Sequence, residues 1–171
     1  GARRLINFPD VSPVNPAGWI PAGGTVTTGN NVDAFLDATG DGSPDNVSNS
    51  NMQNGRALSA SQVFDFPFGD GTTQQDPRGF QPAAVTNLFY FVNVAHDYYY
   101  GLGFNEAAGN FQTDNFGRGG TANDAVRAEA QSGGVTNNAG FASTPDGTAP
   151  RMRMGLFTRG TTLMTDDLDS D

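Results

Sequence analysis

Residues 82–103 read PAAVTNLFYFVNVAHDYYYGLG and carry the clearest periodic pattern of the sequence. The apolar residues and the histidine of this stretch recur at positions i, i+3, i+4 and i+7, the repeat of one face of an α-helix. The members of this face are Val85, Leu88, Phe89, Val92, Ala95, His96, Tyr99 and Leu102. Pro82 suits the first turn of a helix, and the glycines at 101 and 103 suit its end. The sequence therefore predicts one long helix over residues 82–103.

The residues before this helix are rich in turn formers. Residues 26–28 and 31–36 are short strand-like runs separated by glycine and asparagine, and residues 37–60 are polar and predict an exposed loop. Residues 63–68, VFDFPF, alternate aromatic and other side chains and predict a strand. We therefore expect residues 1–80 to form a loop-rich β segment.

The residues after the helix change to a period of two. In residues 125–131 the small apolar side chains Val126, Ala128 and Ala130 share one face, although this composition would also suit a helix. Residues 151–157 alternate more clearly, with two methionines on one face and two arginines on the other. We expect a single lobe over residues 1–171, with a second β segment over 121–160. The predicted class is α+β: a twisted, mostly antiparallel, loop-rich sheet with one long helix.

The composition excludes several classes of function. Among 171 residues there is no Cys and no Lys, and 9 Arg oppose 16 Asp and 2 Glu, for a net charge of −9. Without cysteine there is no disulfide, thiolate zinc site or cysteine nucleophile. The acidic balance argues against nucleic acid as a partner, because phosphate binding needs a basic face. No run approaches 18 apolar residues, so we expect no membrane-spanning helix.

The loop at 37–45, DATGDGSPD, is a candidate calcium site. Asp37, Asp41 and Asp45 recur every four residues with glycines between them, and calcium takes six to eight oxygen ligands in flexible geometry. The spacing is not that of an EF-hand, and a solvated Asp/Gly turn explains the same pattern.

His96 is the only histidine in the chain. A zinc-peptidase helix of the form His-Glu-x-x-His would need a second histidine at position 100 and a glutamate at 97. The chain has Tyr100 and Asp97 there instead. This pattern favours a hydrogen-bonded structural histidine over a metal ligand.

Residues 137–141, NNAGF, are a candidate ligand-binding edge strand. The backbone of such a strand offers ladder hydrogen bonds to an extended peptide, and an asparagine side chain adds a donor and an acceptor. A turn is the alternative interpretation of two adjacent asparagines.

Several motifs resemble one known family. In chain order they are TGNNV at 28–32, NLFY at 87–90, NVAHD at 93–97, YGLGFNE at 100–106, DAVRAEAQ at 124–131, NNAGF at 137–141, TPDG at 144–147 and RMRM at 151–154. Their order and spacing over about residues 82–157 resemble the fungalysin family of secreted zinc metallopeptidases, whose catalytic domain is thermolysin-like. The first 80 residues match more loosely.

The resemblance implies roles for particular residues. It places 124–131 on a strand, and it implies that Asn138, Ala139 and Phe141 hold the peptide substrate at an edge strand. Gly140 stands where the family often has Asn. The closing DLDSD at 167–171 resembles the stretch that leads into the family's zinc helix, so the zinc ligands and the catalytic Glu would lie outside this chain.

Two functional hypotheses follow. In the first, the chain is the N-terminal part of a secreted fungalysin-like zinc metalloendopeptidase, inactive without the C-terminal part of the same protein. In the second, it is a non-catalytic extracellular module, stabilised by calcium, that binds peptides or self-associates through an exposed strand edge.

Overall fold

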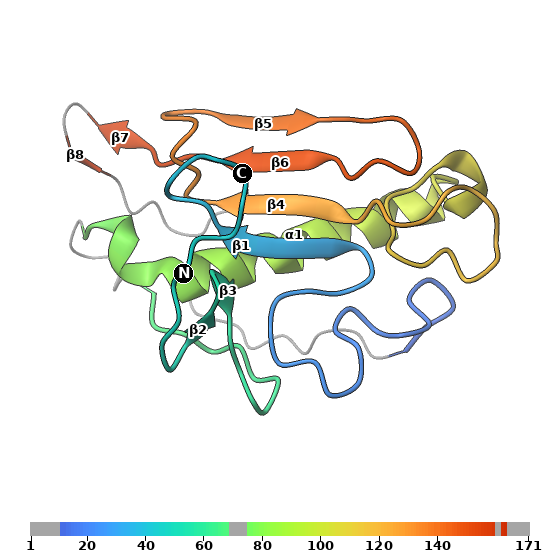
Figure 1. Ribbon diagram of the computed structural model, residues 1–171, viewed down its shortest axis with the longest axis horizontal. Helices are drawn as coiled ribbons and strands as arrows, with labels where there is room; N and C mark the ends of the chain where they lie inside the picture. The colour runs from blue at the N-terminus through green and yellow to red at the C-terminus, as the bar shows by residue number, and fades with distance from the viewer. Residues whose placement is uncertain (1–10, 69–74, 160–161, 164–171) are drawn as a thin grey trace.

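The computed structural model describes residues 11–68, 75–159 and 162–163. The elements are β1 (Val32–Leu36), β2 (Met52–Gln53), β3 (Arg56–Ala57), the 3-10 helix η1 (Pro77–Phe80), α1 (Gln81–Gly101), the 3-10 helix η2 (Glu106–Ala108), β4 (Val126–Ala130), β5 (Ala139–Ala142), β6 (Arg151–Met154), β7 (Thr158–Arg159) and β8 (Thr162–Leu163). Four strands form the main sheet in the order β1-β4-β6-β5, and the remaining strands form two small two-stranded sheets (Figure 1).

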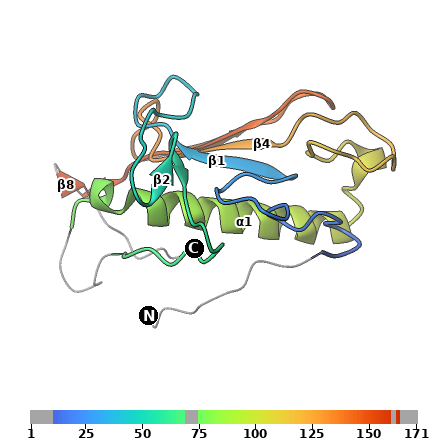
Figure 2. The same cartoon turned by 60° about the horizontal axis from the view of Figure 1, so that its bottom comes forward.

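Helix α1 confirms the helix expected over 82–103 to within two residues. Pro82 lies in its first turn, and the N–H groups of Leu102 and Gly103 close its last turn on the carbonyls of Tyr99 and Tyr100. Gly103 has φ +102°, a conformation that side chains disfavour. The helix lies along one face of the main sheet and leaves the other face free of helix (Figure 2).

The main sheet is mixed. β1 pairs in parallel with β4, β4 pairs in parallel with β6, and β5 is antiparallel to β6. The expectation of a mostly antiparallel sheet is therefore wrong. The reason lies in the connection between β1 and β4, which contains α1. A helical crossover returns the chain to the same end of the sheet, so the two strands run in the same direction.

The predicted period of two in 125–131 and 151–157 is confirmed by β4 and β6, because alternate residues of these strands face opposite sides of the sheet. The side that faces α1 is apolar, and its buried members on β1 and β4 are Val32, Ala34, Leu36, Val126, Ala128 and Ala130. Phe89 and Val85 of α1 are fully buried in the same core. This packing fixes the helix under the β1–β4 half of the sheet.

The strand expected at 63–68 is not formed. Phe64 and Phe66 instead meet edge to face, with ring centroids 6.3 Å apart, and Phe66 reaches the core. The aromatic alternation thus reflects burial of single rings by an irregular segment. The run at 26–28 forms only isolated bridges, one of which joins Val26 to Leu58, whereas the run at 31–36 is confirmed as β1.

Candidate functional site

The predicted edge strand lies at the outer edge of the main sheet, as β5 (Figure 1). Asn138 directly precedes β5, and Ala139 and Phe141 belong to it; all three residues are exposed. The structure therefore brings the three predicted ligand-binding residues together at one edge that no other described strand covers. Both interpretations of the two asparagines hold in part, because 137–138 form the turn that leads into a strand beginning at 139. The role of the three residues in binding stays a prediction.

The pairing with β6 decides which backbone groups of β5 are free. Gly155 donates its N–H to the carbonyl of Asn138 at 3.1 Å, so these two residues form a hydrogen-bonded pair. In an antiparallel ladder such pairs alternate with pairs whose N–H and C=O groups point away from each other. Ala139 lies opposite Met154, and Phe141 lies opposite Met152. The N–H and C=O groups of Ala139 and Phe141 therefore point to the open edge.

The turn that leads into β5 is held firmly by Asn137. This residue has φ +52°, and its side chain donates to Thr158 Oγ1 at 2.9 Å while its Oδ1 accepts the Thr158 N–H at 2.6 Å. A Cβ on Gly155 would lie 2.5 Å from the carbonyl oxygen of Val135. The close approach at Gly155 and the two bonds of Asn137 together fix where β5 starts.

An apolar cavity of about 380 Å³ lies between α1 and the strands β4 to β6. Its lining residues are Val92, Ala95, His96, Tyr99, Phe104, Phe111, Val126, Phe141 and Met152. Phe141 is 47% exposed and Tyr99 is 54% exposed at its mouth. An open cavity this apolar, next to a free strand edge, can receive apolar side chains from a bound polypeptide.

His96 is the only nitrogen-bearing side chain of the cavity wall, and it is fully engaged. Its side chain is 8% exposed; Nδ1 lies 3.0 Å from Asp97 Oδ1, and the Asn110 side-chain nitrogen lies 3.3 Å from Nε2. These contacts fit the structural histidine favoured by the sequence. Within residues 11–68, 75–159 and 162–163, no group of three or more His, Cys, Asp or Glu residues could hold a metal ion.

Asp97 links the helix to the chain's early segment. Its carboxylate accepts hydrogen bonds from the Asn15 amide at 2.8 Å and from Trp19 Nε1 at 2.9 Å. Burial alone would raise the pKa of Asp97, but the hydrogen bonds from His96, Asn15 and Trp19 outweigh it and lower that pKa. An ionised Asp97 therefore holds residues 15–19 against α1.

A buried network of amide side chains extends this link, and no pattern in the sequence predicted it. Asn31 donates to Asn15 Oδ1 at 2.7 Å and to Asn93 Oδ1 at 3.0 Å, and Gln112 donates to Asn31 Oδ1 at 3.3 Å. These four side chains are buried. The one available clue was the asparagine at position 93, in the middle of the predicted helix.

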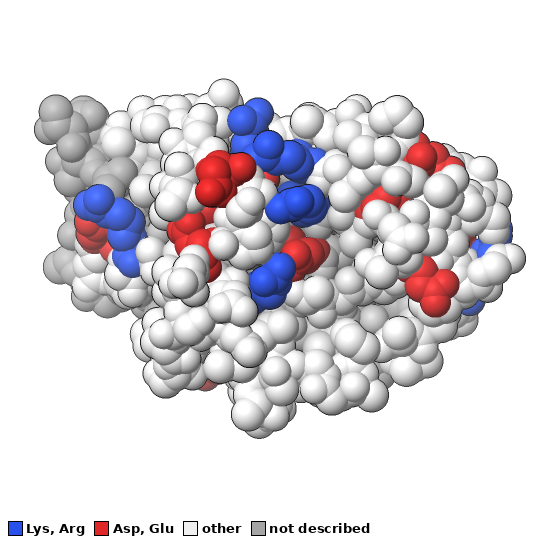
Figure 3. Space-filling model, viewed as in Figure 1, with Lys and Arg blue, Asp and Glu red and all other residues white. Residues whose placement is uncertain are grey.

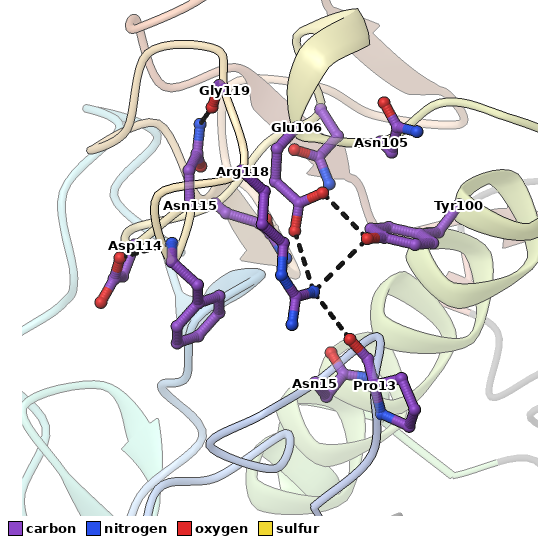
Figure 4. Close-up of polar contacts among 12 residues, drawn as sticks. Pro13, Asn15, Tyr100, Asn105, Glu106, Asp114, Asn115, Arg118 and Gly119 are labelled. Carbon is purple, nitrogen blue, oxygen red and sulfur yellow. Dashed lines mark hydrogen bonds and ion pairs between the residues drawn. The ribbon is translucent and has the colours of Figure 1, made fainter.

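A second polar cluster fixes the far end of α1 (Figure 4). Tyr100 donates to Glu106 Oε2 at 2.9 Å, and Arg118 lies 3.4 Å from Glu106 Oε1 and donates to the Pro13 carbonyl at 2.7 Å. Glu106 is buried. Burial, followed by the hydrogen bond to Glu106, raises the pKa of Tyr100. The cluster joins α1, η2 and two loops.

The candidate calcium residues do not converge on one point. Asp37 is buried and accepts the Gly42 N–H at 3.1 Å; Asp45 accepts the Ala38 N–H at 2.8 Å, and Asp41 accepts the Ser43 N–H at 2.8 Å. Each carboxylate thus stabilises the loop's own backbone. In the described residues these aspartates do not form a group that could hold a metal ion, and calcium binding stays a prediction.

The helix-free face of the sheet carries paired charges (Figure 3). Arg151 on β6 binds the fully buried Glu129 on β4 with two bonds, of 2.6 and 3.0 Å. Phe35 on β1 lies between the guanidinium groups of Arg56 and Arg127, at 5.8 and 5.5 Å from their central carbons. The charges of this face thus tie strands together.

Two further expectations concern the whole chain. In the described parts, no helix is long and apolar enough to cross a membrane. The acidic stretch at 166–171, which the sequence linked to a following zinc helix, lies outside the described residues.

The fold defines a class of protein: an α+β module with one long helix and a mixed sheet whose outermost strand is β5. Comparison with known proteins narrows this class. The family model described as fungalysin metallopeptidase (M36) matches residues 1–171. The chain belongs to the fungalysin family.

Curated relatives agree with this assignment. The chain is 41% identical over 162 residues to "Extracellular metalloproteinase 5" of Trichophyton rubrum, a match covering 93% of this chain and 24% of the relative. It is 39% identical over 173 residues to "Extracellular metalloproteinase MEP" of Fusarium vanettenii, covering 99% and 26%. The chain thus spans about a quarter of the length of these relatives.

Proposed function

We propose that this chain is the N-terminal, substrate-binding part of a secreted fungalysin-type zinc metalloendopeptidase. The observation that carries the proposal is the orientation of Ala139 and Phe141, whose backbone groups point out from the edge strand β5. Membership of the fungalysin family supports it, because the relatives are named as extracellular metalloproteinases. These names also support secretion. The lobe corresponds, in this proposal, to the N-terminal lobe of a thermolysin-like catalytic domain.

In this proposal the substrate adds as a further strand beside β5. Its backbone pairs with the outward groups of Ala139 and Phe141, and the Asn138 side chain supplies one more donor and acceptor. Backbone pairing of this kind reads an extended conformation and leaves residue preference to neighbouring pockets. The Phe141 ring and the apolar cavity beside it form a pocket that could set this preference. The substrate class is therefore an extended peptide or protein segment.

The zinc-dependent chemistry belongs, in this proposal, to the C-terminal part of the same protein. Catalytic zinc needs three protein ligands and an open position, and the described residues contain no group that fits it. Bound zinc would supply a water molecule activated for attack on a peptide bond. The 171-residue chain alone is therefore expected to be inactive. The exposed apolar residues of α1 that do not line the cavity, Phe91, Val94 and Tyr98, are proposed to pack against that C-terminal part.

The proposal is tested with a variant that blocks only the open edge. Ala139→Pro removes an N–H that does not pair with β6, so the sheet keeps its ladder while the substrate loses a partner. We expect kcat/KM of the natural-length gene product on an unstructured protein substrate to fall about tenfold or more, since 1.4 kcal/mol is a factor of ten.

The matched control is Gly140→Ala in the same strand. A Cβ at Gly140 would meet nothing within 4 Å, so this variant should retain full kcat/KM. Equal activity of Ala139→Pro and the wild type, at equal thermal stability, would contradict substrate binding at β5. Peptidase activity of the 171-residue chain alone would contradict the assignment of the zinc chemistry to another part.

Self-association is a second candidate function, and β5 itself favours it. The strand AGFA has neither a charge nor a proline to discourage pairing with another chain. Two copies could pair through β5 of each. Sedimentation velocity on the wild type and on Ala139→Pro tests this: a dimer of the wild type that dissociates in the variant would support it, and a wild-type monomer at high concentration would reject it.

Calcium binding at Asp37, Asp41 and Asp45 is kept as a separate proposal, supported by the acidic loop sequence alone. A bound ion would stabilise the folded state by mass action. The melting temperature should then rise with calcium chloride, fall with a chelator, and become insensitive to both in Asp41→Asn, which changes an exposed carboxylate. A melting temperature unaffected by calcium would reject the site.

A further inference from the structure

The free edge of β5 is not equally open along its length. Of the outward-facing backbone groups, the N–H of Ala139 already has a partner, because it donates to Oδ1 of the preceding Asn138 at 2.9 Å. Asn138 is exposed, so its side chain is free to turn toward solvent. The neighbouring Asn137 is held by its two bonds to Thr158, which keeps the backbone of Asn138 in place. Breaking this hydrogen bond therefore requires only a rotation of the Asn138 side chain, while the backbone stays in place.

We propose that the Asn138 carboxamide caps the edge strand in the free protein and must be displaced by an incoming peptide. Its amide oxygen occupies the position at Ala139 that a carbonyl of the peptide backbone would take. This inference rests on the proposed function, and it adds an autoinhibitory contact to that site. On displacement, Asn138 changes from capping its own strand to contacting the ligand.

The physical reason is competition for one donor. An N–H of a strand edge makes one strong hydrogen bond, so the side-chain oxygen and the peptide carbonyl exclude one another. A hydrogen bond from the peptide to the Ala139 N–H contributes less binding free energy than one to the Phe141 N–H. The reason is that the bond at Ala139 forms only after the bond to Asn138 has been broken. The cap also covers a group that could pair with a strand of another chain.

Amide hydrogen exchange tests the cap without any ligand. In the natural-length protein, the Ala139 amide should exchange about five- to tenfold more slowly than the outward amide of Phe141, after correction for intrinsic rates. Asn138→Ala should abolish this difference, and Asn138→Asp, which keeps an acceptor oxygen, should preserve it. Equal exchange at the two positions in the wild type, or an unchanged Ala139 rate in Asn138→Ala, would overturn the proposal.

Peptide binding tests the competition. The probe is an N-acetylated, C-amidated alanine-rich hexapeptide, measured by calorimetry in the presence of a zinc chelator that prevents its cleavage. Asn138→Asp keeps the cap but cannot donate to the peptide, whereas Asn138→Ala has no cap. We expect Asn138→Asp to bind the probe about three- to tenfold more weakly than Asn138→Ala.

The exchange and binding experiments together separate the inference from the proposed function. If Asn138→Asp binds the probe as tightly as Asn138→Ala, or more tightly, the competition is overturned. Failure of the wild type and both variants to bind would contradict peptide binding at β5, while the exchange rates would still decide whether the cap exists. Gly140→Ala serves as the control in both arms, because it changes neither the cap nor the outward groups.

Discussion

The two halves of the helix-facing side of the sheet differ in how completely they are closed. Under β1 and β4 the side chains are buried against the first half of α1, with Phe89 fully enclosed. Under β6 and β5 the same side opens into the cavity, where Phe141 is 47% exposed. The side chains of the closed half belong to the hydrophobic core, and the open half leaves apolar surface exposed.

The largest test of this difference is Phe89→Ala. The substitution leaves a void in the closed half, and we expect the free energy of unfolding to fall by about 3–5 kcal/mol. Phe141→Ala, in the open half, should change it by less than about 0.5 kcal/mol, because its ring is half exposed already. Urea denaturation of both variants measures the contrast, and equal losses would mean that the halves are equally closed.

A smaller effect is expected where the two halves are joined on the opposite face. Arg151→Met removes the cation that pairs with the fully buried Glu129 carboxylate. We expect a loss of about 2–3 kcal/mol, below the usual range for a buried pair because the arginine side chain is partly exposed. Adding Glu129→Leu should recover much of this loss; a further loss in the double variant would show that the charge itself is not the cause.

The junction between α1 and the segment at 15–19 is expected to respond to acid. The pKa of Asp97 is lower in the folded state than in the unfolded state, where it is about 3.9. Its contribution to the free energy of unfolding is therefore complete above the unfolded-state pKa and is lost as the pH falls through the folded-state pKa. Trp19 bonds directly to this carboxylate, so its fluorescence should change below about pH 4. Asp97→Asn should remove that transition and cost about 1–2 kcal/mol at neutral pH. An identical fluorescence transition in the variant would mean that a group other than Asp97 causes it.

The smallest effect is expected on the open edge itself. Gly140→Ala adds a methyl group where nothing lies within 4 Å, and it restricts the unfolded chain. We expect the variant to be more stable by about 0.4–1 kcal/mol in thermal denaturation. Gly155→Ala, one strand away, should instead be destabilising because its methyl would meet the Val135 carbonyl. A destabilised Gly140→Ala would mean that this edge is less open than described.

The sequence predicted the elements better than their arrangement. The helix at 82–103 and the strand at 151–157 follow from periodicity, which is a local property. The strand at 125–131 also needed the family resemblance, because its composition suits a helix. The direction of β1 relative to β4 depends on where the crossover helix returns the chain, and no local pattern encodes that. The strand expected at 63–68 does not form, and the aromatic rings of this segment pack against one another and against the core.

The position of the candidate site residues could be predicted, but not the contacts that they make. Asn138, Ala139 and Phe141 were assigned to an edge strand; Ala139 and Phe141 lie on one, and Asn138 directly precedes it. The cap made by Asn138 depends on a single rotamer, and the cavity beside Phe141 depends on packing between α1 and β6. The buried amides at 15, 31, 93 and 112 come from distant segments, so only the folded chain reveals that they meet.

The parallel pairing of β1 with β4 also sets an order of events during synthesis. Val32 pairs with Val126, which leaves the ribosome about 90 residues later, so β1 cannot pair with β4 before then. At roughly 5–20 residues per second the first strand stays without its neighbour for about 5–20 seconds. Strand β5 follows β4 in the chain and reaches the sheet only through β6, which is made later still. The outer edge at β5 is therefore the last part of the sheet to be assembled on a nascent chain, after the strands β1 and β4.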